Sequence, residues 1–80
     1  MFDYSKLLGK MREMGETIES LSNKIGISSN SLSNQLHNRT RFVQDEIAGI
    51  CQVLLIEKEE IPVYFFAEKL AKTQDEEVTQ

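Results

Sequence analysis

The segment from Thr17 to Asn38, TIESLSNKIGISSNSLSNQLHN, constrains the fold of this chain most strongly. Its apolar residues recur at helical spacing in two blocks, one before and one after Gly26, so each block offers one stripe to a core. Gly26 suits the left-handed residue that ends a helix, and Ser28 suits the cap that begins the next one. The segment therefore predicts two short helices, over about residues 17–25 and 29–37, joined by a tight turn as a helix-turn-helix.

Further helices are predicted on both sides of this motif. Asp3 is the expected cap of a helix over about residues 4–14, and residues 44–54 form the clearest amphipathic pattern in the chain, with Gly49 as a candidate close helix contact. Residues 57–61 could form a short fifth helix. The VYFF run after Pro62 fits either a short strand or a final helical turn, and the pattern alone leaves both open.

Composition limits the chain to one small domain. With 80 residues its core is marginal unless the helices pack efficiently or the chain dimerises. A single cysteine and a single histidine leave no internal disulfide and no usual Cys/His metal site, and no segment is suited to a membrane or to export. We therefore expect an all-α, cytoplasmic protein without a cofactor, with a folded domain over residues 1–72 and a flexible acidic tail over residues 73–80.

The distribution of charge matters more than its total. The formal net charge of −4 lies entirely in residues 57–80, because acidic and basic residues balance over residues 1–56. The segment from Ser20 to Gln44 contains no acidic residue and carries Lys24, Arg39 and Arg41. Such a segment can approach a phosphate backbone, since affinity for nucleic acid comes mainly from Lys and Arg.

The motif TIESLSNKIGISSNSLSNQL resembles the Xre-type helix-turn-helix family, which includes Cro and repressor proteins of temperate bacteriophages, and the resemblance extends over about residues 7–61. MFDYSKLLGKM and EIPVYFF further resemble small Cro-like proteins of phages from Gram-positive hosts. The resemblance implies a lambda-repressor-like bundle of four to five short helices. Ser22 replaces the usual alanine, and at Gln35 and Leu36 the apolar residue comes one position later than in many members.

The resemblance implies roles for individual residues. In such proteins the second helix of the motif enters the major groove, and its first residues contact base edges. The expected base contacts are Ser29, Asn30, Ser33 and Asn34, and the expected phosphate contacts are Thr17, Lys24, His37, Asn38, Arg39 and Arg41. For each base-contact residue, a merely solvated polar surface is about as good an explanation.

The segment over residues 61–70 is the predicted dimerisation surface, although its aromatic residues could equally close the core of the monomer. The candidate interface residues are Ile61, Val63, Tyr64, Phe65, Phe66 and Leu70. We expect a sequence-specific repressor that binds double-stranded operator DNA as a homodimer. The alternative is an anti-repressor that docks onto another phage regulator. No constellation of catalytic residues points to an enzyme.

Overall fold

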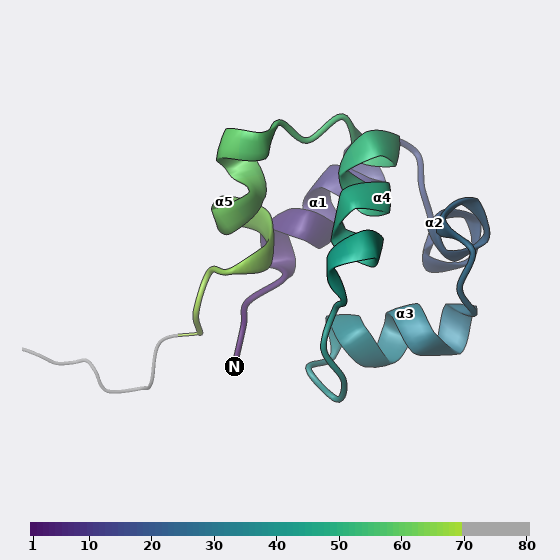
Figure 1. The fold of residues 1–80 in the computed structure, drawn as a ribbon, viewed down its shortest axis with the longest axis horizontal. Helices are drawn as coiled ribbons and strands as arrows, with labels where there is room; N and C mark the ends of the chain where they lie inside the picture. Colours follow the sequence, from purple (N-terminus) through teal and green to yellow (C-terminus); the bar gives the residue numbers. More distant parts are fainter. Residues whose placement is uncertain (70–80) are drawn as a thin grey trace, which may run out of the picture.

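The computed structural model describes residues 1–69, and it contains five α-helices and one 3-10 helix (Figure 1). The helices are α1 (Ser5–Glu13), α2 (Ile18–Ile25), α3 (Ser29–Leu36), α4 (Gln44–Leu54), the 3-10 helix η1 (Lys58–Glu60) and α5 (Ile61–Phe65). No strand occurs within residues 1–69, where Phe2 and Glu68 form an isolated antiparallel bridge. The predicted all-α bundle is thus confirmed. Leu70 and the predicted tail over residues 73–80 lie outside the described residues.

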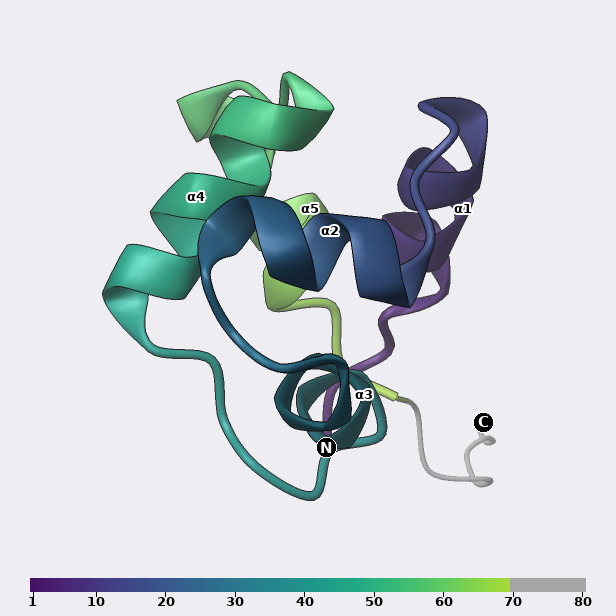
Figure 2. The same cartoon turned by 90° about the vertical axis from the view of Figure 1, so that its right-hand side faces the viewer.

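The helix-turn-helix is formed by α2 and α3, which lie against each other on one side of the bundle. Figure 2 looks along α3 while α2 runs across the view, so the two helices cross steeply. Thr17 and Ser20 cap α2 reciprocally, Gly26 ends it at φ 81°, and the Ser28 hydroxyl accepts a hydrogen bond from the Ser31 amide at 3.0 Å. These are the local signals from which the motif was predicted.

Helix α4 packs on α2 at the predicted position. A Cβ atom placed on Gly49 would lie 3.2 Å from Cγ2 of Ile25, so the glycine permits close approach of the two helices. Ser22 is fully buried and its hydroxyl donates to the Glu19 carbonyl at 2.9 Å, so the hydroxyl at this buried position has a hydrogen-bond partner. The side chains that fill the core are Tyr4, Leu7, Met11, Leu21, Leu32, Leu36, Ile50, Leu54, Ile56 and Phe65.

Two details differ from the predictions, and a third decides an alternative that the sequence left open. Tyr4, not Asp3, occupies the cap position of α1, and the Asp3 carboxylate accepts the Ser5 amide at 2.9 Å from one residue further out. The short helix expected over 57–61 is the 3-10 helix η1, followed at once by α5. Pro62 lies in the first turn of α5, where its missing N–H costs nothing, so the VYFF run continues as helix and not as a strand.

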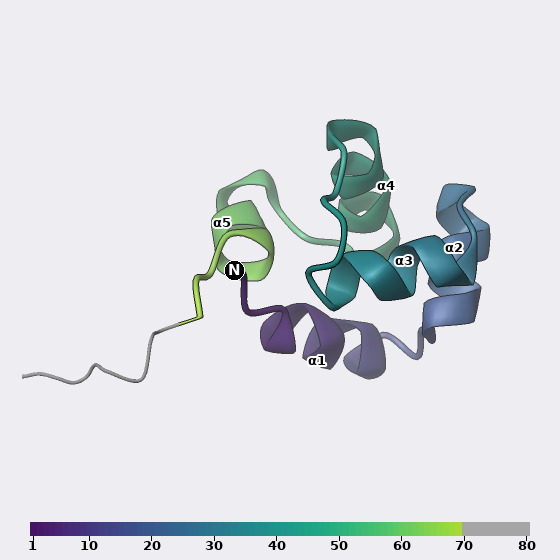
Figure 3. The ribbon, with the colours of Figure 1, turned by 90° about the horizontal axis from the view of Figure 1, so that it is seen from below.

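The two ends of the described chain lie side by side, as Figure 3 shows for the N-terminus and the segment after α5. The Asp3 amide donates to the Ala67 carbonyl at 2.6 Å, and the Lys69 amide donates to the Met1 carbonyl at 3.0 Å. None of the helices in residues 1–69 has the length and apolar character needed to cross a membrane.

Candidate functional sites

The exposed face of α3 is the first candidate site. Ser29 and Asn30 are exposed in its first turn, and Ser33 and Asn34 follow half-buried one turn later. Residues spaced by four share a helix face, so Ser29 lies next to Ser33 and Asn30 lies next to Asn34 along α3. The face carries hydroxyl and amide groups but no charge, which suits recognition by hydrogen bonds rather than by ion pairing.

The end of α3 orients some of these groups. Nη1 of Arg39 lies 3.4 Å from Oδ1 of Asn34, which leaves the Asn34 amide nitrogen free to donate outward. Nδ1 of His37 lies 2.7 Å from the Ser33 carbonyl oxygen. Since a carbonyl only accepts, this ring nitrogen carries the hydrogen and Nε2 is the acceptor of the neutral ring.

The predicted phosphate contacts do not form one group. The Thr17 hydroxyl accepts the Ser20 amide as the cap of α2, and Nζ of Lys24 lies 2.6 Å from Oε2 of Glu16. Hydrogen bonds from Lys24 and then from Ser20 lower the pKa of the Glu16 carboxyl. Lys24 is therefore committed to an ion pair that links the α1–α2 turn to α2.

The arginines are more available than Lys24. Arg39 and Arg41 are exposed, and neither forms an ion pair within residues 1–69. His37 is also exposed, whereas the side chain of Asn38 is occupied by the backbone of Phe2. Of the residues expected to contact phosphate, Arg39 lies beside the α3 face, while Arg41 lines a pocket on another part of the surface.

Gln35 links α3 to the loop that carries Arg41. Its side chain is 5% exposed, and Nε2 donates to Oε1 of Glu46 at 2.6 Å and lies 3.4 Å from the Arg41 carbonyl oxygen. The same Glu46 oxygen accepts the Val43 amide at 3.0 Å, which holds the start of α4. The polar residue at this position therefore fixes the loop between α3 and α4, and Leu36 behind it stays in the core.

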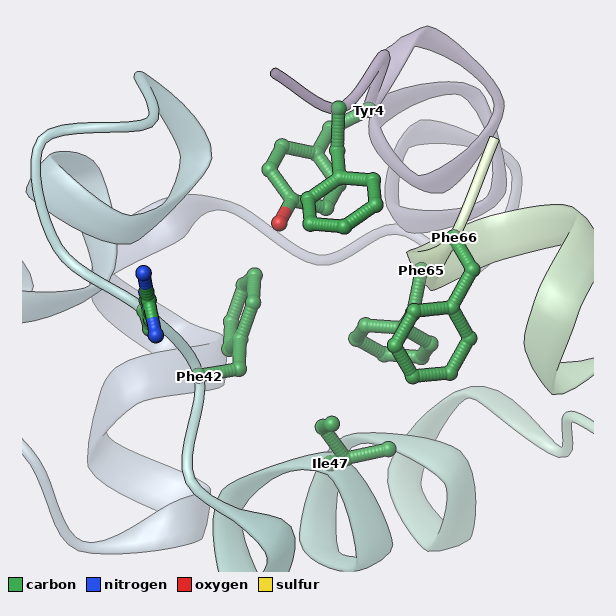
Figure 4. Close-up of a pocket in the computed structure, with 7 residues that line it drawn as sticks. Tyr4, Phe42, Ile47, Phe65 and Phe66 are labelled. Atoms are coloured by element: carbon green, nitrogen blue, oxygen red, sulfur yellow. The ribbon is translucent and has the colours of Figure 1, made fainter. Parts of the chain in front are cut away.

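An aromatic pocket is the second candidate site. Its volume is about 160 Å³, and its lining residues are Phe2, Tyr4, Arg41, Phe42, Ile47, Phe65 and Phe66. Figure 4 shows the rings of Tyr4, Phe42, Phe65 and Phe66 around this space, with Ile47 of α4 on one side. Every aromatic residue of the chain except Tyr64 lines it.

Edge-to-face contacts fix the inner rings of the aromatic pocket. Phe42 lies with its ring centroid 5.4 Å from Tyr4 and 5.4 Å from Phe65, at interplanar angles of 82° and 89°. This geometry brings the positive edge of one ring to the negative face of the next. Phe66 differs from Tyr4, Phe42 and Phe65, because it is 50% exposed. Its ring centroid lies 5.9 Å from that of Phe2.

The residues of the predicted dimerisation segment differ in how far they are buried. Phe65 is 2% exposed and closes the monomer core, which is the alternative that the sequence left open for these aromatic residues. Ile61 and Tyr64 are half-buried, and Val63 and Phe66 remain exposed. Phe65 therefore offers no side chain to a second chain. No role was predicted for Phe2, and the only signal was that aromatic residues recur near both ends of the chain.

Neither site contains a cluster of His, Cys, Asp and Glu that could hold a metal ion, and none occurs elsewhere in residues 1–69. Burial raises the pKa of the Cys51 thiol, so this half-buried side chain on α4 is held in its unreactive protonated form.

Comparison with known proteins identifies the family. Residues 1–68 match the family described as "Protein of unknown function (DUF739)". The chain belongs to the DUF739 family. No curated protein matches this DUF739 chain.

One similar solved structure has a described regulatory role. It is the solution structure of the modulator of repression (MOR) of the temperate bacteriophage TP901-1 from Lactococcus lactis, with 35% sequence identity and a TM-score of 0.70. The similarity covers 81% of the DUF739 chain and 88% of that chain. The likeness includes nearly the whole of both folds, and it connects this chain to phage regulatory proteins.

Proposed function

We propose that this DUF739 protein is a phage or prophage regulator that modulates repression by binding another regulatory protein, with the aromatic pocket as its docking site. The observation that carries the proposal is an open apolar pocket, with half-exposed Phe66, in a chain similar to a modulator of repression. It acts by binding and not by catalysis, and its place of action is the cytoplasm.

The chemistry of the pocket suits a protein partner. Concave sites lined by aromatic side chains bind apolar groups, and aromatic residues and arginine dominate the binding energy of many protein interfaces. Arg41, which forms no ion pair with any of residues 1–69, adds a cation to a pocket without an acidic lining residue. An apolar side chain of the partner, next to an acidic one, would therefore be complementary to it. A net charge of −4 also weakens attraction to DNA in the absence of such a partner.

A second candidate is the DNA-binding homodimeric repressor of the Xre type. It is favoured by the exposed Ser29 and Asn30 in the first turn of α3 and by the acid-free segment around them. Asparagine can bond adenine at two edge atoms, and Arg39 beside the α3 face could contact a phosphate. In this candidate the exposed Val63 and Phe66 would contribute to the dimer surface.

The two candidates are separated by one pair of variants. The wild-type protein, Phe66→Ala and Asn30→Ala are each titrated against the repressor encoded in the same phage genome and, separately, against the operator DNA of that repressor. If the pocket binds the repressor, Phe66→Ala weakens this binding by roughly thirtyfold or more and Asn30→Ala leaves it nearly unchanged, since a central aromatic anchor contributes about 2 kcal/mol or more.

The opposite pattern would support the DNA-binding candidate. Sequence-dependent binding to the operator without repressor, lost in Asn30→Ala and retained in Phe66→Ala, would contradict modulation through the pocket. Asn30 and Phe66 are exposed in the wild-type protein, so circular dichroism should show that each variant retains the helical fold.

A further inference from the structure

Asn38 has a left-handed backbone conformation, and its side chain bonds to a residue far away in the sequence. It follows the end of α3 with φ 63°, in the left-handed region that asparagine tolerates better than most residues. Its amide donates to the Gln35 carbonyl at 3.1 Å, which holds it against the last turn of the helix. The position of its side chain is therefore set by α3.

The side chain of Asn38 pairs with the backbone of Phe2, 36 positions earlier in the chain. The Phe2 amide donates to Oδ1 of Asn38 at 2.9 Å, and Nδ2 of Asn38 donates to the Phe2 carbonyl at 2.8 Å. One side-chain amide thus satisfies both backbone groups of one residue. The primary amide of asparagine supplies the acceptor and the donor together. We refer to this pair of bonds as the Asn38 clasp.

The Asn38 clasp fixes one wall of the aromatic pocket. The ring of Phe2 lies 5.9 Å from Phe66 and 6.3 Å from Tyr4, and all three rings line the pocket. The backbone–backbone hydrogen bonds of residues 1–3 join them to residues 67–69. Within residues 1–69, the Asn38 clasp supplies the hydrogen bonds that connect these paired ends to the helix-turn-helix.

We propose that Asn38 is a positioning residue of the aromatic pocket, which holds the Phe2 ring in place from the end of α3. The pocket and the helix-turn-helix are then mechanically connected, and a displacement of the α3 end changes the shape of the pocket. The clasp uses Oδ1 and one of the two hydrogens of Nδ2, and the expected phosphate contact of Asn38 stays a prediction. Its consequence for a docked partner rests on the function proposed above.

The first test observes the pocket itself by NMR of the full chain. Asn38→Gly removes both clasp bonds and tolerates the left-handed backbone, and Asn38→Asp keeps an acceptor for the Phe2 amide but loses the donor. Arg39→Ala is the matched control on the next residue, since it leaves the clasp intact. We expect hydrogen exchange of the Phe2 amide to accelerate by roughly tenfold in Asn38→Gly, the gain from losing a hydrogen bond of ordinary strength.

Asn38→Gly should also lose the nuclear Overhauser contacts between the rings of Phe2 and Phe66, whereas amides of α2 and α4 keep their protection. In Asn38→Asp the Phe2 amide should retain more protection than in Asn38→Gly, which a general loss of stability would not produce. Unchanged exchange of the Phe2 amide and unchanged ring contacts in Asn38→Gly would overturn the proposal.

The second test measures binding of the same phage repressor. Asn38→Gly should weaken it in the same direction as Phe66→Ala, and Arg39→Ala should not. If the wild-type protein does not bind the repressor, the proposed function fails, but the NMR comparison still decides the role of Asn38. If the ring contacts are lost while repressor binding is unchanged, the Phe2 wall does not serve docking, and that part of the inference is wrong.

Discussion

The α3 face and the aromatic pocket are built in opposite ways. All the side chains of the α3 face come from one helix of eight residues, which Ser28 caps at its start. The aromatic pocket takes its lining from the N-terminal segment, the loop after α3, α4 and α5. The first surface is therefore a property of a local motif, and the second exists only when distant segments are packed together.

This difference changes what each region needs for stability. Helix α3 consists largely of serine and asparagine, which are poor helix formers, so it depends on its cap and on the burial of Leu32 and Leu36. The pocket rests on Phe65, a fully packed ring of the common core. Changes at the base of the pocket should therefore affect the whole domain, and changes on the α3 face should stay local.

The largest loss of stability is expected from a substitution of Phe65 at the base of the pocket. Phe65→Ala should lower the free energy of unfolding by about 3–5 kcal/mol, because it leaves a cavity where the ring packs edge-to-face on Phe42. Phe66→Ala, the matched change on the neighbouring half-exposed ring, should cost about 1 kcal/mol or less. Urea unfolding followed by circular dichroism measures both. Equal losses would mean that the two rings share one environment, contrary to their burial.

An intermediate effect is expected at the cap of α3. Ser28→Ala removes the hydroxyl that accepts the Ser31 amide and should cost about 1 kcal/mol. Ser29→Ala, one residue further along and exposed, should change stability by less than about 0.5 kcal/mol. If thermal unfolding shows no difference between the two variants, α3 is held by tertiary packing alone and the contrast with the pocket disappears.

The smallest effect is expected at the ion pair of Glu16 and Lys24, next to the helix-turn-helix. The pKa of Glu16 is lowered in the folded state, so its carboxylate stabilises the fold fully above the ordinary glutamate pKa of 4.5 and progressively less as pH falls through the lowered value. Lys24→Met should reduce this acid dependence. Urea midpoints measured from neutral to acidic pH should fall less steeply for the variant, and parallel curves would show that the pair contributes nothing.

The helices were predictable where the signals are local. Residues 44–54 are helical from end to end as the apolar spacing indicated, and Thr17, Gly26 and Ser28 mark the helix ends that their chemistry favours. The prediction was wrong for the cap of α1, and the local pattern left open whether the VYFF run is a strand or a helix. The contacts between residues 1–3 and 67–69 are reported by no local pattern in the sequence.

The candidate sites divide in the same way. The four α3 residues were identified through the resemblance to the Xre-type motif, and their function stays a prediction. Arg41 shows what the sequence could not predict about the sites. Its position near Arg39 in the NRTR loop suggested that both arginines have the same role. The fold instead places Arg41 in the pocket and leaves Arg39 beside Asn34. Two residues apart in the chain, they belong to different surfaces.

The sequence by itself determined the helix-turn-helix, since caps, turn glycine and helical periodicity act over a few residues. Only the tertiary structure decided that Phe65 belongs to the core, that Phe66 stays exposed, and that Asn38 binds Phe2. The physical reason is that burial and side-chain pairing depend on which distant segments meet. Here that meeting brings both ends of the described chain to the end of α3 and creates the aromatic pocket.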